Sequence, residues 1–224
     1  MDYAKKIEKL KKRIEQACLR SKRDPREVSI IAATKYAEAE QIRELVENGI
    51  NMLGENRADR LVEKSQKITK PVCWHFIGHL QSRKSKIVVP IVDYIHSIDK
   101  ISTLEKVGRE AAKNNKVQKV LVEVNVSGEG SKFGISPQDA DDFLAEAIRV
   151  ENVEVKGFMA MAPLTGDRDL IRDIFRRSRE LLISENNRFE GLTLTELSMG
   201  MSNDFEIAIE EGATMIRVGS ILFK

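Results

Sequence analysis

The chain has 224 residues, of which 42% are hydrophobic and 32% charged, and its formal net charge is +2. This composition is ordinary for a soluble globular protein, and so small a charge gives no argument for a nucleic-acid partner. No run of about 18 uncharged apolar residues could span a membrane, and no apolar signal-peptide segment opens the chain. Cys18 and Cys73 form no CxxC pair, so we expect no disulfide framework, no zinc site and a cytoplasmic location.

An amphipathic helix is predicted at the start of the chain, where apolar residues recur at helical spacing: Tyr3, Ile7, Leu10, Ile14 and Cys18. We interpret the early basic residues as a solvated helix face. Apolar runs then alternate with helical patterns. The predicted strands are Val28–Thr34, Asn51–Leu53, Val72–Ile77, Tyr94–Ser97, Val117–Asn125, Val153–Met159, Thr193–Leu197 and Thr214–Val218. The predicted helices between them are Ala39–Glu47, Arg57–Lys67, Arg83–Val88, Ile101–Lys113, Pro137–Val150, Asp169–Ser184 and Asn203–Glu211.

This alternation indicates a parallel sheet, because parallel neighbours need crossover connections. Eight such units in this length favour an α/β fold, a single closed (β/α)8 barrel over residues 1–224 with an extra N-terminal helix. An open, doubly wound sheet is the alternative, although no GxGxxG or GxxxxGK[ST] motif follows any strand. Local signals agree with the helix ends: Ser136 precedes Pro137, Asn203 and Glu206 fit a capping box, and Gly49 and Gly212 stand at C′ positions.

Lys35 closes the first predicted strand, at the barrel face where active sites lie. We expect the strand to shield it from water, which disfavours the ammonium form and frees the amine to attack an aldehyde. A strand-end lysine that extends into solvent is the alternative.

Two loops near the end of the chain are typical of a phosphate site. Serine and glycine residues follow the seventh predicted strand at Ser198, Gly200 and Ser202, and the eighth at Gly219 and Ser220. Barrels commonly bind phosphate after these two strands, with backbone N–H groups and a helix N-terminus facing the anion. A lysine facing such a site is the layout of a Schiff-base site for pyridoxal 5′-phosphate (PLP). Ordinary turns are the alternative for each loop alone.

Arg217 lies in the eighth predicted strand among apolar neighbours, and a buried charge needs a partner. A cofactor's ring nitrogen or phosphate could be that partner, as could a strand glutamate such as Glu123. Asn56 could reach a ligand or merely begin a helix. His75 and His79 do not form an HExxH motif, so a metal site is not expected.

Taken together, the chain resembles the pyridoxal phosphate homeostasis protein family, which is related to the barrel domain of alanine racemases. The motifs that carry the resemblance cover nearly the whole chain: Ala33-Thr-Lys35, Gly54-Glu-Asn-Arg57, Trp74-His-Phe-Ile-Gly-His-Leu-Gln81, Asn125, Ser131-Lys-Phe-Gly134, Gly157-Phe-Met-Ala-Met161, Leu197-Ser-Met-Gly-Met-Ser-Asn-Asp204 and Arg217-Val-Gly219.

The resemblance implies PLP bound to Lys35 as an internal aldimine, its phosphate held by Ser198, Gly200 or Ser202 with Gly219 and Ser220. It also implies that Arg217 faces the pyridine nitrogen and keeps it unprotonated, and that Lys132 handles the cofactor as a second site or exit element. One departure is Ala37, where some members carry a second lysine.

We therefore expect a monomer that buffers PLP or delivers it to PLP-requiring apoenzymes, with no dedicated catalytic residues. The expectation of no enzyme activity has a reason, because the chain ends soon after the eighth strand and we expect no second domain with a racemase tyrosine. A weak racemase-like PLP enzyme and a PLP-free phosphate-binding barrel are the rival hypotheses.

Overall fold

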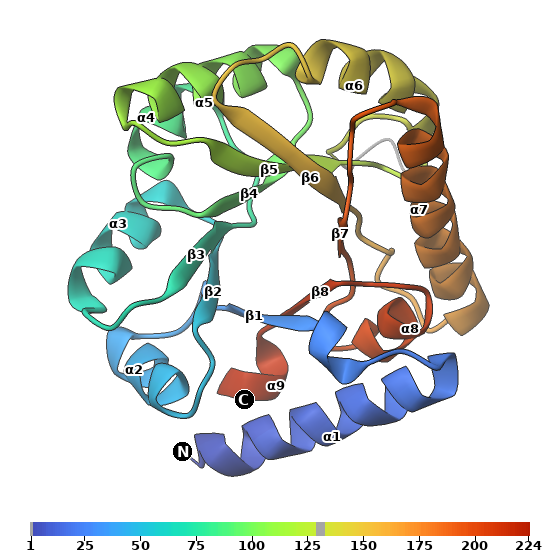
Figure 1. Cartoon of the computed structure of the whole chain (residues 1–224). Helices are drawn as coiled ribbons and strands as arrows, with labels where there is room; N and C mark the ends of the chain where they lie inside the picture. Colours follow the sequence, from blue (N-terminus) through green and yellow to red (C-terminus); the bar gives the residue numbers. More distant parts are fainter. Residues whose placement is uncertain (1, 129–132) are drawn as a thin grey trace.

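The strands of this chain close into a ring (Figure 1). A computed structural model describes residues 2–128 and 133–224, and within them β1 to β8 pair in sequence order, β8 returns to β1, and every pair is parallel. The strands are β1 Ser29–Ala33, β2 Met52–Glu55, β3 Cys73–Phe76, β4 Tyr94–Ile98, β5 Gln118–Glu123, β6 Val153–Met159, β7 Glu196–Ser198 and β8 Met215–Val218. The predicted closed barrel is confirmed, and the alternative of an open, doubly wound sheet is wrong.

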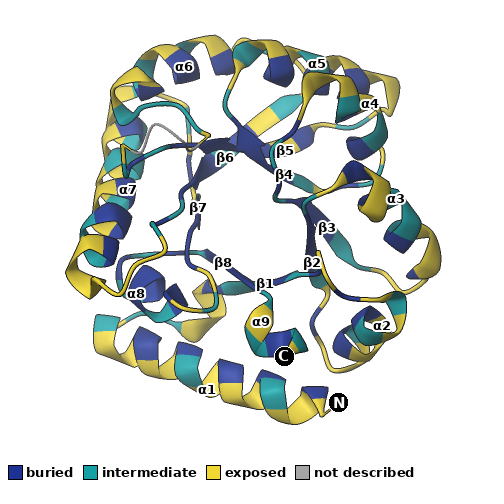
Figure 2. Cartoon of the chain, turned by 180° about the vertical axis from the view of Figure 1, so that it is seen from behind, coloured by how far each residue is buried: buried dark blue, intermediate teal, exposed yellow. Residues whose placement is uncertain are grey.

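Helices surround the ring and bury the faces that they turn toward it (Figure 2). They are α1 Tyr3–Ser21, α2 Ala39–Glu47, α3 Ala58–Lys67, α4 Ser85–Val88, α5 Ile101–Lys113, α6 Ala140–Ala147, α7 Arg168–Arg188, α8 Phe205–Glu210 and α9 Ser220–Phe223. Short 3-10 turns are η1 Pro25–Glu27, η2 Ser82–Lys84 and η3 Pro137–Asp139. All eight predicted strands and the predicted helices are present, with ends that differ by a few residues.

The local capping signals are confirmed at three of four positions. The Ser136 hydroxyl accepts the N–H of Gln138 at the start of η3, and Gly49 and Gly212 have positive φ after α2 and α8. The capping box predicted at Asn203 is wrong. Helix α8 begins only at Phe205, because Asp204 Oδ1 accepts the N–H of Met201 and so stabilises a turn ahead of the helix.

The N-terminal helix α1 packs beside α8 and α9 (Figure 1). Its predicted apolar stripe is buried: Tyr3, Ile7, Leu10, Ile14 and Cys18. Two of its basic residues pair with carboxylates of α8, Arg13 with Glu206 at 3.0 Å and Arg20 with Glu210 at 2.6 Å. Part of the basic face of α1 therefore contacts α8. The prediction that the early basic residues form a solvated face is correct only for the rest of them.

The buried side chains form two clusters. The larger lies between strands and helices. The smaller holds Ile31, Leu121, Met159 and Met215, which come from β1, β5, β6 and β8. Since β1 and β5 lie on opposite sides of the ring, these residues can meet only in the barrel interior, which is therefore a packed core.

Candidate functional site

The predicted site residues gather at the carboxyl ends of strands on one side of the barrel. Lys35 follows β1, Ser198 ends β7, and Arg217 lies in β8. The order of the ring places β1 beside β8 and β8 beside β7. Arg217 is the register partner of Ile31, four positions before Lys35. Closure of the barrel thus brings Lys35 close to loops that lie more than 160 positions away in sequence.

Lys35 is exposed, so the expected shielding by the strand is wrong. Strand β1 ends at Ala33, the next residue, Thr34, is buried, and the chain turns at Lys35 and Tyr36. The lysine therefore lies on the rim, and its Nζ stands 5.2 Å from the centre of the Tyr36 ring. An exposed amine on the rim is accessible to a ligand that enters from solvent.

The backbone before Lys35 is held by a buried group of charges. Lys64 of α3 forms an ion pair with Glu55 at the end of β2, and both side chains are almost fully buried. The Lys64 ammonium also donates to the Thr34 carbonyl at 2.6 Å, while the Thr34 hydroxyl donates to Glu55 Oε1 at 3.0 Å. These bonds fix the turn from which Lys35 extends. Nothing in the sequence marks Lys64 as buried, because a lysine in a helical pattern is ordinarily exposed.

The loops after β7 and β8 are bonded to each other. The Arg217 N–H donates to the Gly200 carbonyl at 2.9 Å, and the Gly219 N–H donates to Ser202 Oγ at 3.2 Å. Gly200 has φ of +89°, and a Cβ there would stand 2.5 Å from Cβ of Ala208. Only glycine fits this close approach of the loop to α8. Ser220 is the first residue of α9, which the sequence analysis did not predict.

Arg217 is buried, with 5% of its surface exposed. Its guanidinium donates to Ser198 Oγ at 2.5 Å and to the Ala160 carbonyl at 3.1 Å, and both acceptors are neutral. Burial lowers the pKa of Arg217 to about 10, against the opposing charges of Asp204 and Glu123. Among the described residues no carboxylate lies within ion-pair distance of Arg217, so the alternative of an ion pair with Glu123 is wrong. The buried Arg217 guanidinium therefore suits a further hydrogen-bond acceptor, such as one from a ligand.

Asn56 follows β2 beside a cleft of about 400 Å³, which Phe76, Gly78 and His79 also line. Its Oδ1 atom is buried and has no hydrogen-bond partner in the described part of the chain. An unpaired buried acceptor is costly, so Asn56 suits a donor from a bound molecule. Among the described residues, those that line this cleft do not include Lys35, Ser198 or Arg217. Lys132, the predicted second cofactor residue, lies outside the described residues.

Glu123, which the sequence suggests only as a partner of Arg217, is a buried titratable group. It ends β5 and is almost fully buried. Burial raises its pKa to about 7, the charge of Asp99 acts in the same direction, and Arg217 opposes the rise. A carboxyl group that can hold or release a proton near neutral pH therefore lies near the guanidinium of Arg217. Sequence carries no signal for this, because Asp99 and Arg217 come close to Glu123 only in the fold.

The described ranges contain no cluster of three or more His, Cys, Asp or Glu side chains that could hold a metal ion. None of the helices in residues 2–128 and 133–224 combines the length and apolar character that a membrane crossing requires. Cys18 and Cys73 are both free thiols.

Comparisons with known proteins agree on one family. The description "alanine racemase, N-terminal domain" matches residues 5–224. The pyridoxal phosphate homeostasis protein of Aquifex aeolicus is 38% identical over 224 residues, which are 100% of this chain and 98% of that protein. The protein of the same name from Escherichia coli K12 is 31% identical over 232 residues, covering 99% of this chain and 96% of that protein.

Solved structures extend the likeness to three dimensions. PipY of Synechococcus elongatus PCC7942, with PLP bound, has a TM-score of 0.86 and 32% identity and covers 100% of both chains. An alanine racemase of Clostridium difficile has a TM-score of 0.71 at 14% identity, over 88% of this chain and 52% of that one. At so low an identity the racemase shows a shared fold only.

Proposed function

Since this chain belongs to the alanine racemase N-terminal domain family, and within it to the pyridoxal phosphate homeostasis proteins, we propose that it binds PLP and takes part in PLP homeostasis. The observation that carries the proposal is Arg217, a buried guanidinium with only neutral acceptors, in the strand beside the one that ends before Lys35. Such a group fits a heteroaromatic nitrogen or an anion.

When bound, PLP supplies an aldehyde and a phosphate dianion. The Lys35 amine, at the rim of β1, would hold the cofactor through its aldehyde. The hydroxyl and N–H groups of the two bonded loops would hold the phosphate: Gly200, Ser202, Gly219 and Ser220. The buried Ser198 hydroxyl, also predicted to hold it, is bonded instead to Arg217 and to Nδ1 of His96. Arg217 would face the pyridine nitrogen, and because arginine has no acceptor, it would leave that nitrogen unprotonated. Asn56 would accept a hydrogen bond from the bound molecule.

The attachment is tested by adding PLP, reducing with borohydride and mapping the pyridoxyl group to a peptide. We expect a yellow protein that is bleached by borohydride and labelled at Lys35. The Lys35→Ala variant should lose the label, whereas Lys70→Ala, which removes an exposed lysine distant in sequence from the site, should keep it. A colourless wild-type protein, or label spread over surface lysines in both variants, would refute PLP binding at Lys35.

In homeostasis the protein buffers PLP or delivers it to PLP-requiring apoenzymes, as a cytoplasmic monomer of one domain with no dedicated catalytic activity. The names of the relatives support this role. Delivery by direct contact is supported by exposed apolar side chains in four loops that follow strands: Tyr36, Phe133, Leu164 and Met201. Leu164 is 94% exposed and Tyr36 85%. Apolar side chains so exposed around a ligand site are typical of a contact surface.

Direct delivery is tested with the PLP-loaded protein and an apo aminotransferase, either mixed or separated by a dialysis membrane. We expect faster reactivation in the mixture, and slower reactivation with the Leu164→Ser variant in the same mixture. Equal rates with and without the membrane would show that PLP travels only by release into solution.

A weak racemase-like activity is the second candidate, and Glu123 is the observation that favours it. A carboxyl with a pKa of about 7 can exchange a proton near Arg217. The test is exchange of the α-proton of amino acids with deuterium from solvent. The Arg217→Glu variant should favour a protonated ring nitrogen and raise any such exchange. Absence of exchange in both proteins would reject an enzymatic role for this site.

A further inference from the structure

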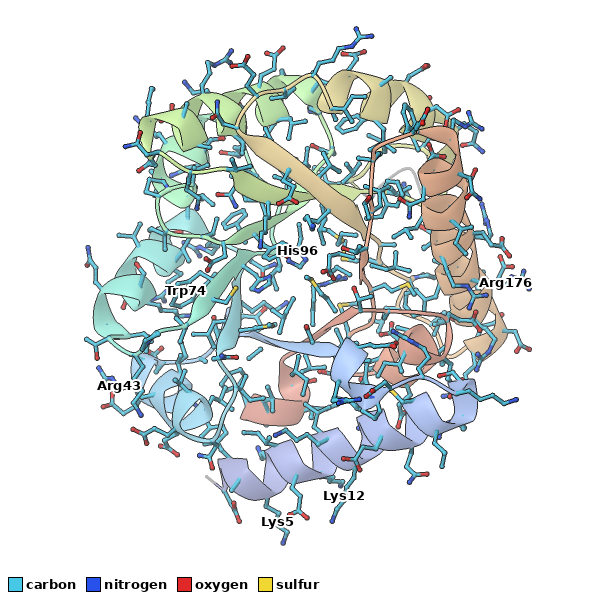
Figure 3. The ribbon with its side chains drawn as sticks, in the orientation of Figure 1. Lys5, Lys12, Arg43, Trp74, His96 and Arg176 are labelled. Atoms are coloured by element: carbon cyan, nitrogen blue, oxygen red, sulfur yellow. The ribbon has the colours of Figure 1, made fainter. Side chains whose placement is uncertain are left out.

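A line of hydrogen bonds crosses the barrel interior from Arg217 to the opposite end. Arg217 donates to Ser198 Oγ at 2.5 Å, and Ser198 Oγ lies 2.9 Å from Nδ1 of His96. Nε2 of His96 lies 2.9 Å from Nδ1 of His75, and Nε2 of His75 lies 3.3 Å from Sγ of Cys73. The residues come from β8, β7, β4 and β3. Figure 3 shows His96 within the ring of strands.

The direction of every bond in this line follows from Arg217. A guanidinium has no acceptor, so Arg217 must be the donor to Ser198. The Ser198 hydroxyl is fully buried and needs an acceptor for its own proton, and within residues 2–128 and 133–224 Nδ1 of His96 is its one other bonded atom. His96 Nδ1 is therefore unprotonated.

The hydrogen bonds from His96 to His75 and from His75 to Cys73 have the same donor-to-acceptor direction. His96 and His75 are 0% and 1% exposed, and burial lowers the pKa of His75 to about 4 and that of His96 well below its ordinary value. Both rings are therefore neutral at pH 7, with one N–H each. His96 carries its proton on Nε2 and donates to His75 Nδ1, and His75 carries its proton on Nε2 and donates to Cys73.

His75 and Cys73, at the end of the line farthest from Arg217, have contacts of their own. The Tyr94 ring stacks on His75 with 5.0 Å between centroids and 5° between planes. Burial raises the pKa of the Cys73 thiol to about 12, with a further contribution from the charge of Asp93. Every donor in the line thus points away from the Arg217 cation, at the carboxyl end of the barrel, and toward the Asp93 carboxylate, at the amino end. The two charges favour this arrangement.

We propose that Ser198, His96 and His75 are positioning residues, which hold the Arg217 guanidinium in one orientation so that its remaining N–H groups face the bound cofactor. The inference rests on the proposed function, since it concerns the donor that would meet PLP. Two bonds, to Ser198 Oγ and to the Ala160 carbonyl, fix the guanidinium, and the two neutral rings fix the orientation of Ser198 Oγ. Fixed donors hold a ligand better than mobile ones, because less conformational freedom is lost on binding.

The line itself is tested without PLP, by recording histidine ring ¹⁵N and ¹H shifts at pH 7 in the ligand-free protein. We expect His75 and His96 both neutral and both protonated on Nε2. The Ser198→Ala variant should shift the His96 Nδ1 signal, whereas Ser178→Ala, which removes a buried serine bond within α7, should not. A cationic ring, or a proton on Nδ1 of either histidine, would overturn the proposed direction of the bonds.

The effect on the site is tested by the Kd for PLP, with the absorbance spectrum of the bound form as a second readout. We expect Ser198→Ala and His96→Leu to raise Kd about tenfold, which corresponds to about 1.4 kcal/mol, and to shift the absorbance maximum. His96→Gln, which keeps one donor and one acceptor, should recover most of the affinity, and Ser178→Ala should match the wild type.

The outcomes separate the two proposals. If the wild type binds PLP but Ser198→Ala and His96→Leu leave both Kd and spectrum unchanged, the positioning role is refuted and the proposed function stands. If the wild type does not bind PLP, both fail, while the ring shifts still report the direction of the bonds. Should Ser198→Ala not fold, His75→Gln against His75→Phe makes the same comparison one residue farther along the line.

Discussion

Glu123 predicts an unusual dependence of stability on pH. The folded protein holds the proton of this carboxyl up to about pH 7, whereas an unfolded chain releases it near 4.5, because burial and Asp99 disfavour the charged form. Raising the pH between these two values therefore removes stability from the folded state. The difference between 4.5 and about 7 corresponds to about 3 kcal/mol at 1.36 kcal/mol per pH unit.

The perturbation is the Glu123→Gln variant, which keeps the shape of the side chain but cannot ionise. Urea unfolding of the ligand-free wild type and variant at pH 4.5 and pH 8 gives the free energy of unfolding of each. We expect the variant to gain about 3 kcal/mol relative to wild type between the two pH values. His75 and His96 titrate alike in both proteins, so their contribution cancels in the difference.

The exposed residue Glu105 supplies the matched control. The Glu105→Gln variant should differ from wild type by less than about 0.5 kcal/mol at either pH. A Glu123→Gln difference that stays constant with pH, or that favours the wild type as pH rises, would refute the argument that burial keeps Glu123 protonated.

Three further changes test the framework of the site. Lys64→Met should lower the free energy of unfolding by about 3–5 kcal/mol, measured with denaturant, because it leaves the Glu55 carboxylate buried without its partner. Its control is Lys67→Met, which disrupts an exposed ion pair and should change that free energy by less than about 1 kcal/mol. Gly157→Ala should cost more than about 4 kcal/mol or prevent folding, since its Cβ would stand 1.8 Å from the Glu196 carbonyl of the neighbouring strand; soluble yield and thermal unfolding would show it. The Gly200→Ala variant should weaken PLP binding at least tenfold, measured by absorbance titration, because the new Cβ would displace the loop from α8.

The alternation of apolar runs and helical patterns was enough to predict the eight strands and the barrel. The reason is local, because periodicity along the chain reflects which face of each segment is buried. The same pattern placed Lys35 and Arg217 at or near the ends of neighbouring strands, and the residue motifs were enough to indicate the family. The site residues themselves stay predictions until binding is measured.

Other features depend on contacts between distant segments, and no pattern in the sequence could reveal them. Ser198 and His96 stand 102 positions apart, yet their side chains are bonded inside the barrel. The burial of Lys64 arises because α3 packs beside the end of β2. The exposure of Lys35 depends on where β1 ends, which was predicted one residue too late.

The sequence by itself therefore determined the order of the elements, the closed barrel and the residue types at its carboxyl end. Only the tertiary structure decided which polar groups are paired, which are left with an unused donor or acceptor, and which titrate near neutral pH. The physical reason is that hydrogen bonding and desolvation act over a few ångströms in space, and the closure of the barrel sets those distances between residues far apart in the chain.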